Sequence, residues 1–216
     1  ANQQNQAVFI NLGGIANITW YNQENDTLLG WDIGPANALL DNWIKQNQGL
    51  DYDHKGQWAQ SGKVIEDLYD QFAQDAYFSM PAPKSTGRDY FNIDWLHKNI
   101  RNEKPEDIQA TLVELTVRQI ACAIESVAAK STAPVYLYGK GVRNSYLVQR
   151  LKSLCGKMHI CATEEIHIPA QWLEGGLYAW LAYCYQEKVP IDLSQVTGAK
   201  KTSILGAKYY GKVSLS

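Results

Sequence analysis

One carboxylate stands out as a candidate for chemistry. Asp32 lies near the end of an apolar segment, residues 28–33, and Gly34 and Pro35 follow that segment. Burying an aspartate in a sheet costs free energy unless its charge has a partner or a task. At the end of a strand the carboxylate could act as a general base, because it could reach the proton of a nucleophile by a hydrogen bond. The alternative is structural, with Asp32 capping the turn or the next helix.

Two bends that contain glycine are candidates for binding phosphate groups. Gly13 and Gly14 separate two apolar segments, and Gly139 and Gly141 lie between a short apolar segment and a predicted helix that starts at Asn144. Backbone amides in such bends, and at helix N-termini, point toward bound anions. The second bend favours this function more than the first, since two glycines in a hairpin are also an ordinary turn.

Neither of the two common nucleotide-binding motifs occurs in the sequence. The Gly-Lys pairs at 62–63 and 156–157 are followed by Val64 and Met158 rather than by the hydroxyl residue that a P-loop needs for Mg²⁺. The bend after residue 138 has Asn144 where the dinucleotide-binding motif has its third glycine. A nucleotide would therefore have to bind by a different arrangement.

The cysteines predict free thiols rather than a disulfide framework. None of the four forms a C-x-x-C pair, which is typical of a protein in the reducing cytoplasm. Cys161 lies between His159 and His167, and that grouping could suggest a metal site. We interpret residues 158–162 instead as a short buried strand whose side chains pack, and we predict no metal ligands.

Composition limits the remaining classes of protein. The chain has 216 residues, of which 45% are hydrophobic and 19% charged, so it can bury a core and is not intrinsically disordered. Its 20 basic and 22 acidic residues leave no positive excess, which argues against a nucleic-acid partner. No apolar run approaches the roughly 18 residues of a membrane span, so we expect no membrane partner.

The first part of the chain predicts three strands of an antiparallel meander, followed by helices. The strands are expected at residues 7–12, 15–21 and 28–33. The following helix has Asn37 as a candidate N-cap and Gly49 just after its end. Further helices are expected at 64–72, 92–97 and 105–130, with an irregular loop around residues 81–88.

Strands and helices alternate in the last part of the chain. We expect a strand at 135–138, a helix at 144–154, a strand at 158–162 and a helix at 170–185. This alternation predicts parallel strands joined by crossover helices. The fold class is therefore α/β: an RNase H-like lobe of three antiparallel strands extended by parallel strands, with flanking helices and a helical insertion at about 50–104.

The chain resembles the anhydro-N-acetylmuramic acid kinases, a family of the two-lobed, ATP-binding sugar kinase, Hsp70 and actin superfamily. The resemblance spans nearly the whole chain, and its most specific segment is KSTGR, residues 84–88. The other matching segments are NLGGIANIT (11–19), DIGPANALLDNW (32–43), GKGVRNSYL (139–147), WLEGGLYAWLA (172–182), and TGA with LGA (197–199, 205–207).

The resemblance implies a reaction and roles for individual residues. ATP and Mg²⁺ would serve to open the 1,6-anhydro bridge of anhydro-N-acetylmuramic acid with water while O6 is phosphorylated, giving N-acetylmuramic acid 6-phosphate in murein recycling. Asp32 matches the catalytic aspartate that takes a proton from this water, and Glu174 and Asn37 are substrate-binding candidates. Gly13, Gly14 and Asn17 match the hairpin near the ATP phosphates, and Gly139, Gly141 and Asn144 the loop beside the adenosine. Glu174 could also be a solvated helix residue.

Three features depart from the family pattern or stay open. Lys140 occupies a position where the family usually has glycine, so we expect a rearranged contact with the nucleotide. Gly175 and Gly176 are expected to interrupt the helix after Glu174. The role of residues 84–88 stays open between substrate, phosphate, a second subunit and a solvated loop.

The resemblance covers residues 1–216 as a C-terminal lobe, without the family's N-terminal phosphate-binding lobe. We therefore expect the chain alone to be inactive, because phosphoryl transfer needs groups on both sides of the nucleotide. The missing lobe and a second copy in a homodimer are the expected partners, besides the anhydro-sugar. The alternatives are a nucleotide-binding switch or a noncatalytic interaction module of the same superfamily.

Overall fold

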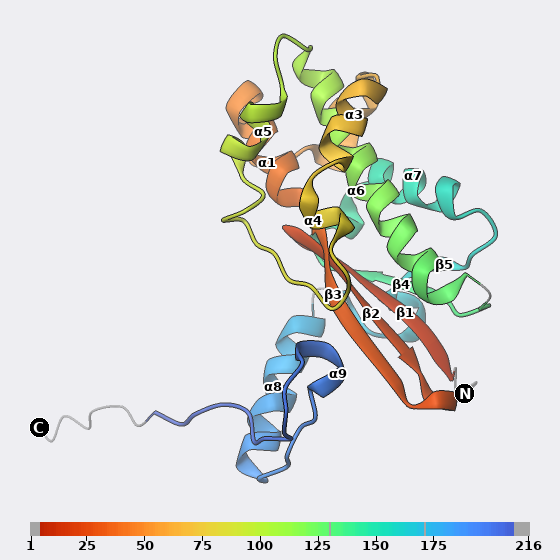
Figure 1. Ribbon diagram of the computed structural model, residues 1–216, viewed down its shortest axis with the longest axis vertical. Coiled ribbons are helices and arrows are strands. Elements are labelled where there is room, and N and C mark those ends of the chain that lie inside the picture. Colours follow the sequence, from red (N-terminus) through yellow and green to blue (C-terminus); the bar gives the residue numbers. More distant parts are fainter. Residues whose placement is uncertain (1–4, 130, 171, 210–216) are drawn as a thin grey trace, which may run out of the picture.

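The computed structural model describes residues 5–129, 131–170 and 172–209, and a mixed sheet of five strands lies at its centre (Figure 1). In spatial order the strands are β3, β2, β1, β4 and β5. Strand β2 pairs with β1 and β3 in antiparallel orientation, whereas β4 pairs with β1 and β5 in parallel. The bounds are β1 Gln6–Leu12, β2 Ile15–Asn22, β3 Thr27–Pro35, β4 Val135–Tyr138 and β5 Ile160–Ala162. The predicted fold class is thus confirmed.

The two faces of the sheet differ in character because successive side chains of a strand point to opposite sides. One face carries buried apolar side chains, among them Val8, Ile10 and Ile18, and joins the main core. Helix α6, Pro105–Ala128, packs across the strands on this side (Figure 1). The opposite face carries polar residues in register, and these include the candidate site.

The helices largely follow the sequence prediction. Besides α6 they are α1 Asn37–Gln48, α2 Gln57–Ser61, α3 Glu66–Ala73, α4 Ala76–Ser79, α5 Ile93–Asn99, α7 Ser145–Cys155, α8 Leu173–Gln186 and α9 Ser194–Thr197. Proline at the first position of α6 suits a helix start, as expected. The predicted insertion is present as α2 to α5, of which α2 and α4 are too short to show a helical period in the sequence.

Two local expectations were wrong, and a third falls partly outside the described residues. The N-cap of α1 is Ala36 and not Asn37, whose side chain is used differently. Helix α8 runs uninterrupted through Gly175 and Gly176, because helical hydrogen bonding tolerates glycine at a modest free-energy cost. The long helix ends at Ala128, and Lys130, its expected last residue, lies outside the described residues.

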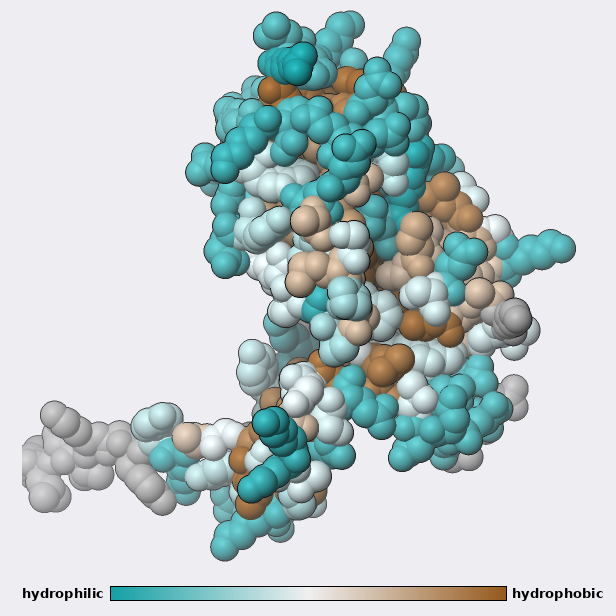
Figure 2. Space-filling model, viewed as in Figure 1, coloured by the Kyte–Doolittle hydropathy of each residue, from teal (hydrophilic) through white to brown (hydrophobic). Residues whose placement is uncertain are grey.

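Helices α8 and α9 lie apart from the other helices, below the sheet in Figure 1, with α9 against β3. Large apolar side chains of α8 are exposed, including Tyr178 at 67% and Trp180 at 50%. Figure 2 shows hydrophilic residues over most of the upper, helical part and hydrophobic ones exposed where the sheet approaches α8 and α9. Among the described residues, no helix combines the length and apolarity needed to cross a membrane.

Candidate functional site

A row of polar side chains crosses four neighbouring strands on the open face of the sheet. Asn11 of β1 lies opposite Asn17 of β2, and Asn17 lies opposite Asp32 of β3. On the other side, Asn11 is in register with Tyr138 of β4. Because directly opposed residues share a face of the sheet, the row runs from Tyr138 to Asp32. The sheet therefore places Asp32 and Asn17 side by side, next to both glycine bends.

A β-bulge sets the position of Asp32 in this row. The pairing of β2 with β3 shifts between Ala16 and Asn17, so that Ile33 has no opposite residue. Ile33 is buried in the core, while Asp32 stays half-buried on the open face. Bulges of this kind redirect side chains and are frequent beside active sites. The extra residue thus lets β3 keep its apolar contact and still present the carboxylate.

Asp32 is held by the 84–88 loop, not by a helix cap. Its Oδ2 accepts hydrogen bonds from Ser85 Oγ at 2.8 Å and from the Thr86 backbone N–H at 3.0 Å. Its backbone N–H donates to the Lys84 carbonyl, and its own carbonyl accepts from the Tyr77 hydroxyl. The Ser85 hydroxyl and the Thr86 backbone N–H donate to the same oxygen, so within the described part of the chain Oδ1 has no protein donor. The loop orients the carboxylate and leaves one oxygen available.

A shallow pocket of about 470 Å³ opens beside Asp32. Strands β2 and β3 line it with Asn17, Thr19 and Asp32, and the loop and α9 close its sides with Ser85 and Thr197. A second hollow of about 490 Å³ lies on the other side of the loop, between Tyr77 and Tyr90. Ser85 lines both hollows, so the 84–88 loop is the wall between them.

The two basic residues of the loop differ in their surroundings. Lys84 donates from Nζ to the carbonyls of Tyr77 and Phe78, at 2.9 and 3.1 Å, and lies over the Tyr77 ring. Burial lowers the pKa of Lys84. Its role is to anchor the loop to α4. Arg88 is exposed and lies against the Gly13 and Gly14 turn. The sequence left the role of this loop open. In the structure Lys84 is engaged with α4, whereas Arg88 is exposed beside the turn.

The two glycine bends pack against each other. A side chain at Gly139 would meet Asn11 and the Leu12 carbonyl, and one at Gly141 would come within 2.7 Å of Asn37 Nδ2. Gly139 also has a positive φ of 86°, which favours glycine. The close approach of these two backbone segments explains why Gly139 and Gly141 are glycine, without a ligand. The same approach brings the predicted nucleotide-binding segments to one edge of the sheet.

Asn37 and Asn144 support the bends through hydrogen bonds. Asn37 Nδ2 donates to the carbonyls of Leu12 at 3.0 Å and Gly13 at 2.7 Å, which ties α1 to the hairpin turn. Asn144 is buried and caps α7, since its Oδ1 accepts the Leu147 N–H at 3.1 Å. Both predicted site residues thus hold the backbone at the site, and Asn144 serves as the expected helix start.

Glu174 lies in the first turn of α8, beyond the other end of the polar row. Its side chain is exposed. Burial and, secondly, the negative charge of Glu174 raise the pKa of Tyr138, so the carboxylate lies near that end of the row. Glu174 therefore lies toward the Tyr138 end of the polar row, and Asp32 is at the opposite end.

A half-buried carboxylate, Asp41 on α1, faces the bends from the helix side. Burial raises its pKa to about 6, although the charges of Arg88 and Lys140 act in the opposite direction. Lys140 is exposed at the second bend. The edge of the sheet at Gly13 and Gly14 thus carries two cations around one carboxyl group.

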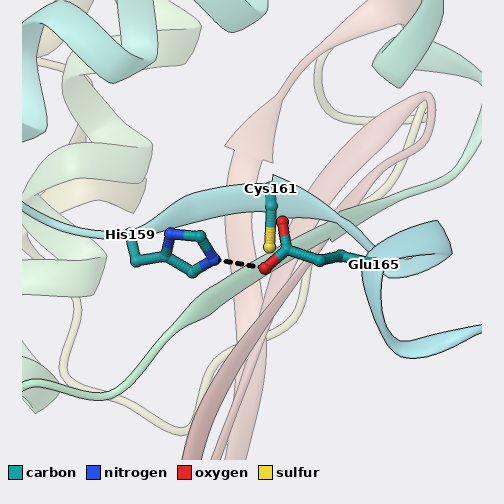
Figure 3. Close-up of side chains that lie close together, drawn as sticks. All are labelled: His159, Cys161 and Glu165. Carbon is teal, nitrogen blue, oxygen red and sulfur yellow. Dashed lines mark hydrogen bonds and ion pairs between the residues drawn. The ribbon is translucent and has the colours of Figure 1, made fainter.

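The cluster around Cys161 lies on β5 and the turn after it (Figure 3). His159 Nε2 and Glu165 Oε1 are 2.6 Å apart, and the thiol of Cys161 points toward the same carboxylate. Burial, with a contribution from Glu165, raises the pKa of Cys161 to about 11, which disfavours the thiolate that binds metals. Cys161 packs with Ala7 and Tyr136, in agreement with the packing interpretation. Glu165, not His167, completes the group.

Several residues of the site have little or no signal in the local sequence. Ser85, Thr86 and Tyr77 contact Asp32 across more than forty positions of sequence, and no local pattern encodes such contacts. Asn11 had a weak signal, because it is the polar residue in an apolar strand and alternates with the buried Ile10 and Leu12. An alignment of strands by face would have placed it beside Asn17.

Comparison with known proteins relates the chain to one family. The family model described as anhydro-N-acetylmuramic acid kinase matches residues 1–211. The protein of that name from Coxiella burnetii (strain Dugway 5J108-111) is 48% identical over 213 residues, which cover 97% of this chain and 57% of the relative. The one from Pasteurella multocida is 41% identical over 209 residues, 95% of this chain and 55% of the relative. The chain thus spans little more than half the length of these relatives.

A solved structure supports the fold. The activator of the 2-hydroxyisocaproyl-CoA dehydratase from Clostridium difficile, with bound ADPNP, matches with a TM-score of 0.50 at 16% identity. The match covers 89% of this chain and 65% of that one. It extends the likeness to a protein solved with a nucleotide analogue, at the level of the fold alone. The family assignment rests on the sequence: the family model matches residues 1–211, and the chain belongs to the anhydro-N-acetylmuramic acid kinase family.

Proposed function

We propose that this chain is the C-terminal lobe of an ATP-dependent kinase that converts 1,6-anhydro-N-acetylmuramic acid and water to N-acetylmuramic acid 6-phosphate. The observation that carries the proposal is Asp32. Two donors fix its Oδ2, and Oδ1 is left without a protein donor among the described residues, beside a pocket. A general base needs this combination of fixed orientation and a free oxygen.

In the proposed reaction, Asp32 Oδ1 accepts a proton from the attacking water. The water oxygen bonds to the anomeric carbon, and the bond from this carbon to the bridging O6 breaks. O6 takes the terminal phosphoryl group of ATP, so ADP leaves, and the proton on Asp32 later returns to solvent. The hydrogen bonds from Ser85 and Thr86 hold the carboxylate in place during the proton transfer.

The nucleotide would lie along the glycine bends, with its phosphates beside Gly13, Gly14 and Asn17. Mg²⁺ prefers carboxylate, phosphate and water oxygens, and Asp32 supplies the one carboxylate among the described residues that line the pocket. The residues therefore fit a metal that would be held mainly by phosphate and water oxygens, with the Asp32 carboxylate nearby. When bound, Mg²⁺ would neutralise phosphate charge. The chain's own contribution is to position the sugar and the water.

The chain alone is proposed to be inactive. The match covers only 57% of the Coxiella burnetii relative, and the pocket at Asp32 is a shallow depression in one face. Phosphoryl transfer requires charged groups and exclusion of water on both sides of the nucleotide. The lobe that would close the site is then the main partner. The four cysteines are free, which fits the proposed cytoplasmic location.

The test compares Asp32→Asn with the unchanged enzyme in a protein of full family length. We expect turnover to fall by about 10²–10⁴-fold or more, since a general base contributes on this order. The affinity for ATP should stay within about twofold. Asp70→Asn, an exposed aspartate on α3, is the matched control. A near-normal rate in the Asp32 variant would refute the assignment.

A further inference from the structure

The guanidinium group of Arg88 is seated on the turn between β1 and β2. A Cβ atom added at Gly14 would come within 2.7 Å of Arg88 Nη2 and 2.8 Å of Nε. The group therefore occupies the space where a side chain of residue 14 would begin. Glycine at position 14 lets the 84–88 loop lay Arg88 across the turn, a short distance along the chain from the two residues that hold Asp32.

Arg88 differs from Lys84, the other cation of the loop, in its hydrogen bonds. Lys84 is committed to two carbonyls, as described above. Among the residues that the structure describes, Arg88 has neither a hydrogen bond nor an ion pair. Its five N–H groups, which match the oxygens of a carboxylate or phosphate in a planar fork, remain available.

The surrounding charges leave this point positive. Asp41 faces both Arg88 and Lys140, and it is the carboxyl group shared between them. Asp51 and Asp53 also act on Asp41, but they are engaged elsewhere. Asp51 pairs with Lys45 at 3.1 Å, and the carboxylate of Asp53 accepts the N–H groups of Trp58 and Ala59. The charges of two cations thus act on one carboxyl group at the sheet edge.

We propose that Arg88, assisted by Lys140, binds an anionic group of the ligand beside the turn of Gly13 and Gly14. The inference rests on the proposed function, and the group is either a phosphoryl group of the nucleotide or the lactyl carboxylate of the sugar. Both present oxygens that an arginine fork binds through two hydrogen bonds. The loop thereby joins two tasks, because Ser85 and Thr86 orient the base while Arg88 fixes a charged part of the ligand.

The test measures binding to this chain by NMR titration, which detects weak complexes. The probes form two pairs that differ in charge: ATP against adenosine, and anhydro-N-acetylmuramic acid against 1,6-anhydro-N-acetylglucosamine, which lacks the carboxylate. In Arg88→Ala we expect about 10- to 100-fold weaker binding of one anionic probe, with its neutral counterpart unchanged. Loss for ATP identifies the phosphoryl group, and loss for the muramic acid sugar identifies the carboxylate.

Two further variants separate binding from folding. Gly14→Ala keeps Arg88 but displaces its flexible end, so it should weaken the same probe to a smaller extent while the chain stays folded by circular dichroism. Arg101→Ala removes an exposed charge between α5 and α6 and is the matched control.

Two results would overturn the inference. Arg88→Ala could bind every probe as Arg101→Ala does, or it could lose charged and neutral probes equally, which would make Arg88 structural. If the unchanged chain binds neither ATP nor the anhydro-sugar, the same titration with a protein of full family length decides, and absence of binding there refutes the proposed function and the inference with it.

Discussion

Replacing Asp41 by asparagine should stabilise the chain at neutral pH and have no effect near pH 4. Burial raises the pKa of this carboxyl from 3.8 to about 6, so the folded state holds the proton more tightly than the unfolded chain does. The stabilisation from the protonated form is complete below pH 3.8 and is lost as the pH rises through 6. Above pH 6 the folded protein carries a carboxylate that is solvated less well than in the unfolded chain.

The expected size follows from this pKa. A rise of about 2 pH units corresponds to at most about 3 kcal/mol at pH 7. Because the group is only half-buried, solvent screening reduces this to about 1 kcal/mol. Asparagine carries no charge, so Asp41→Asn should be more stable by about that amount at pH 7.5. This free energy already includes the effect of Arg88 and Lys140, because their positive charges lower the pKa of Asp41 and the value of about 6 reflects that.

The assay is urea unfolding followed by tryptophan fluorescence at several pH values between 4 and 8. The free energy of unfolding of the variant, minus that of the unchanged chain, should rise from about zero to its full value across pH 4 to 7. Asp70→Asn, on the exposed side of α3, should show no such trend. If Asp41→Asn is less stable at pH 7.5, the carboxylate is a net-favourable partner of Arg88 or Lys140, and burial is not the dominant effect.

Two other substitutions test the site and the packing. In a protein of full family length, Ser85→Ala should lower kcat by about tenfold with little change in the KM for ATP, because one hydrogen bond to the Asp32 carboxylate is lost. Ser85→Thr should restore part of the rate. Steady-state kinetics measure both constants, and a changed KM with an unchanged kcat would make Ser85 a substrate contact. Gly62→Ala should destabilise the chain by about 1–3 kcal/mol, because the new methyl group would collide with the Glu106 carbonyl of α6. Gly175→Ala in α8 meets open space and should stabilise the chain by about 0.5–1 kcal/mol. Urea unfolding measures both changes in the free energy of unfolding, and an equal effect of the two variants would contradict the reasoning.

Sequence patterns predicted the elements with strong periodicity and missed features that depend on contacts across the fold. The strands around Ile10 and Ile18 and the helix from Pro105 follow from local spacing of apolar residues. The bulge at Ile33 leaves no mark in composition, since the extra residue is apolar like Leu28, Leu29 and Trp31 of the same strand. The contact of the 84–88 loop with Asp32 joins segments separated by α1 to α4, so only the folded chain reveals it.

Asn37 illustrates the same limit at a single residue. Asparagine before a helical run favours an N-cap, yet Ala36 takes that place and the Asn37 amide donates to the neighbouring turn. The competing partner was a pair of backbone carbonyls in another element, which intrinsic cap preferences do not include. Local rules thus placed the helix correctly and assigned its first side chain wrongly.

The contact of the 84–88 loop with β3 also bears on how the chain avoids self-association. Strand β3 is an outer strand of the sheet, and its outward amides could template pairing with another molecule. The Lys84 carbonyl accepts one of them, from Asp32, and the Gln195 side chain accepts another, from Leu28. A loop that orients a carboxylate thereby also blocks an aggregation-prone edge, so shortening it would be expected to yield intermolecular β-structure as well as a misplaced Asp32.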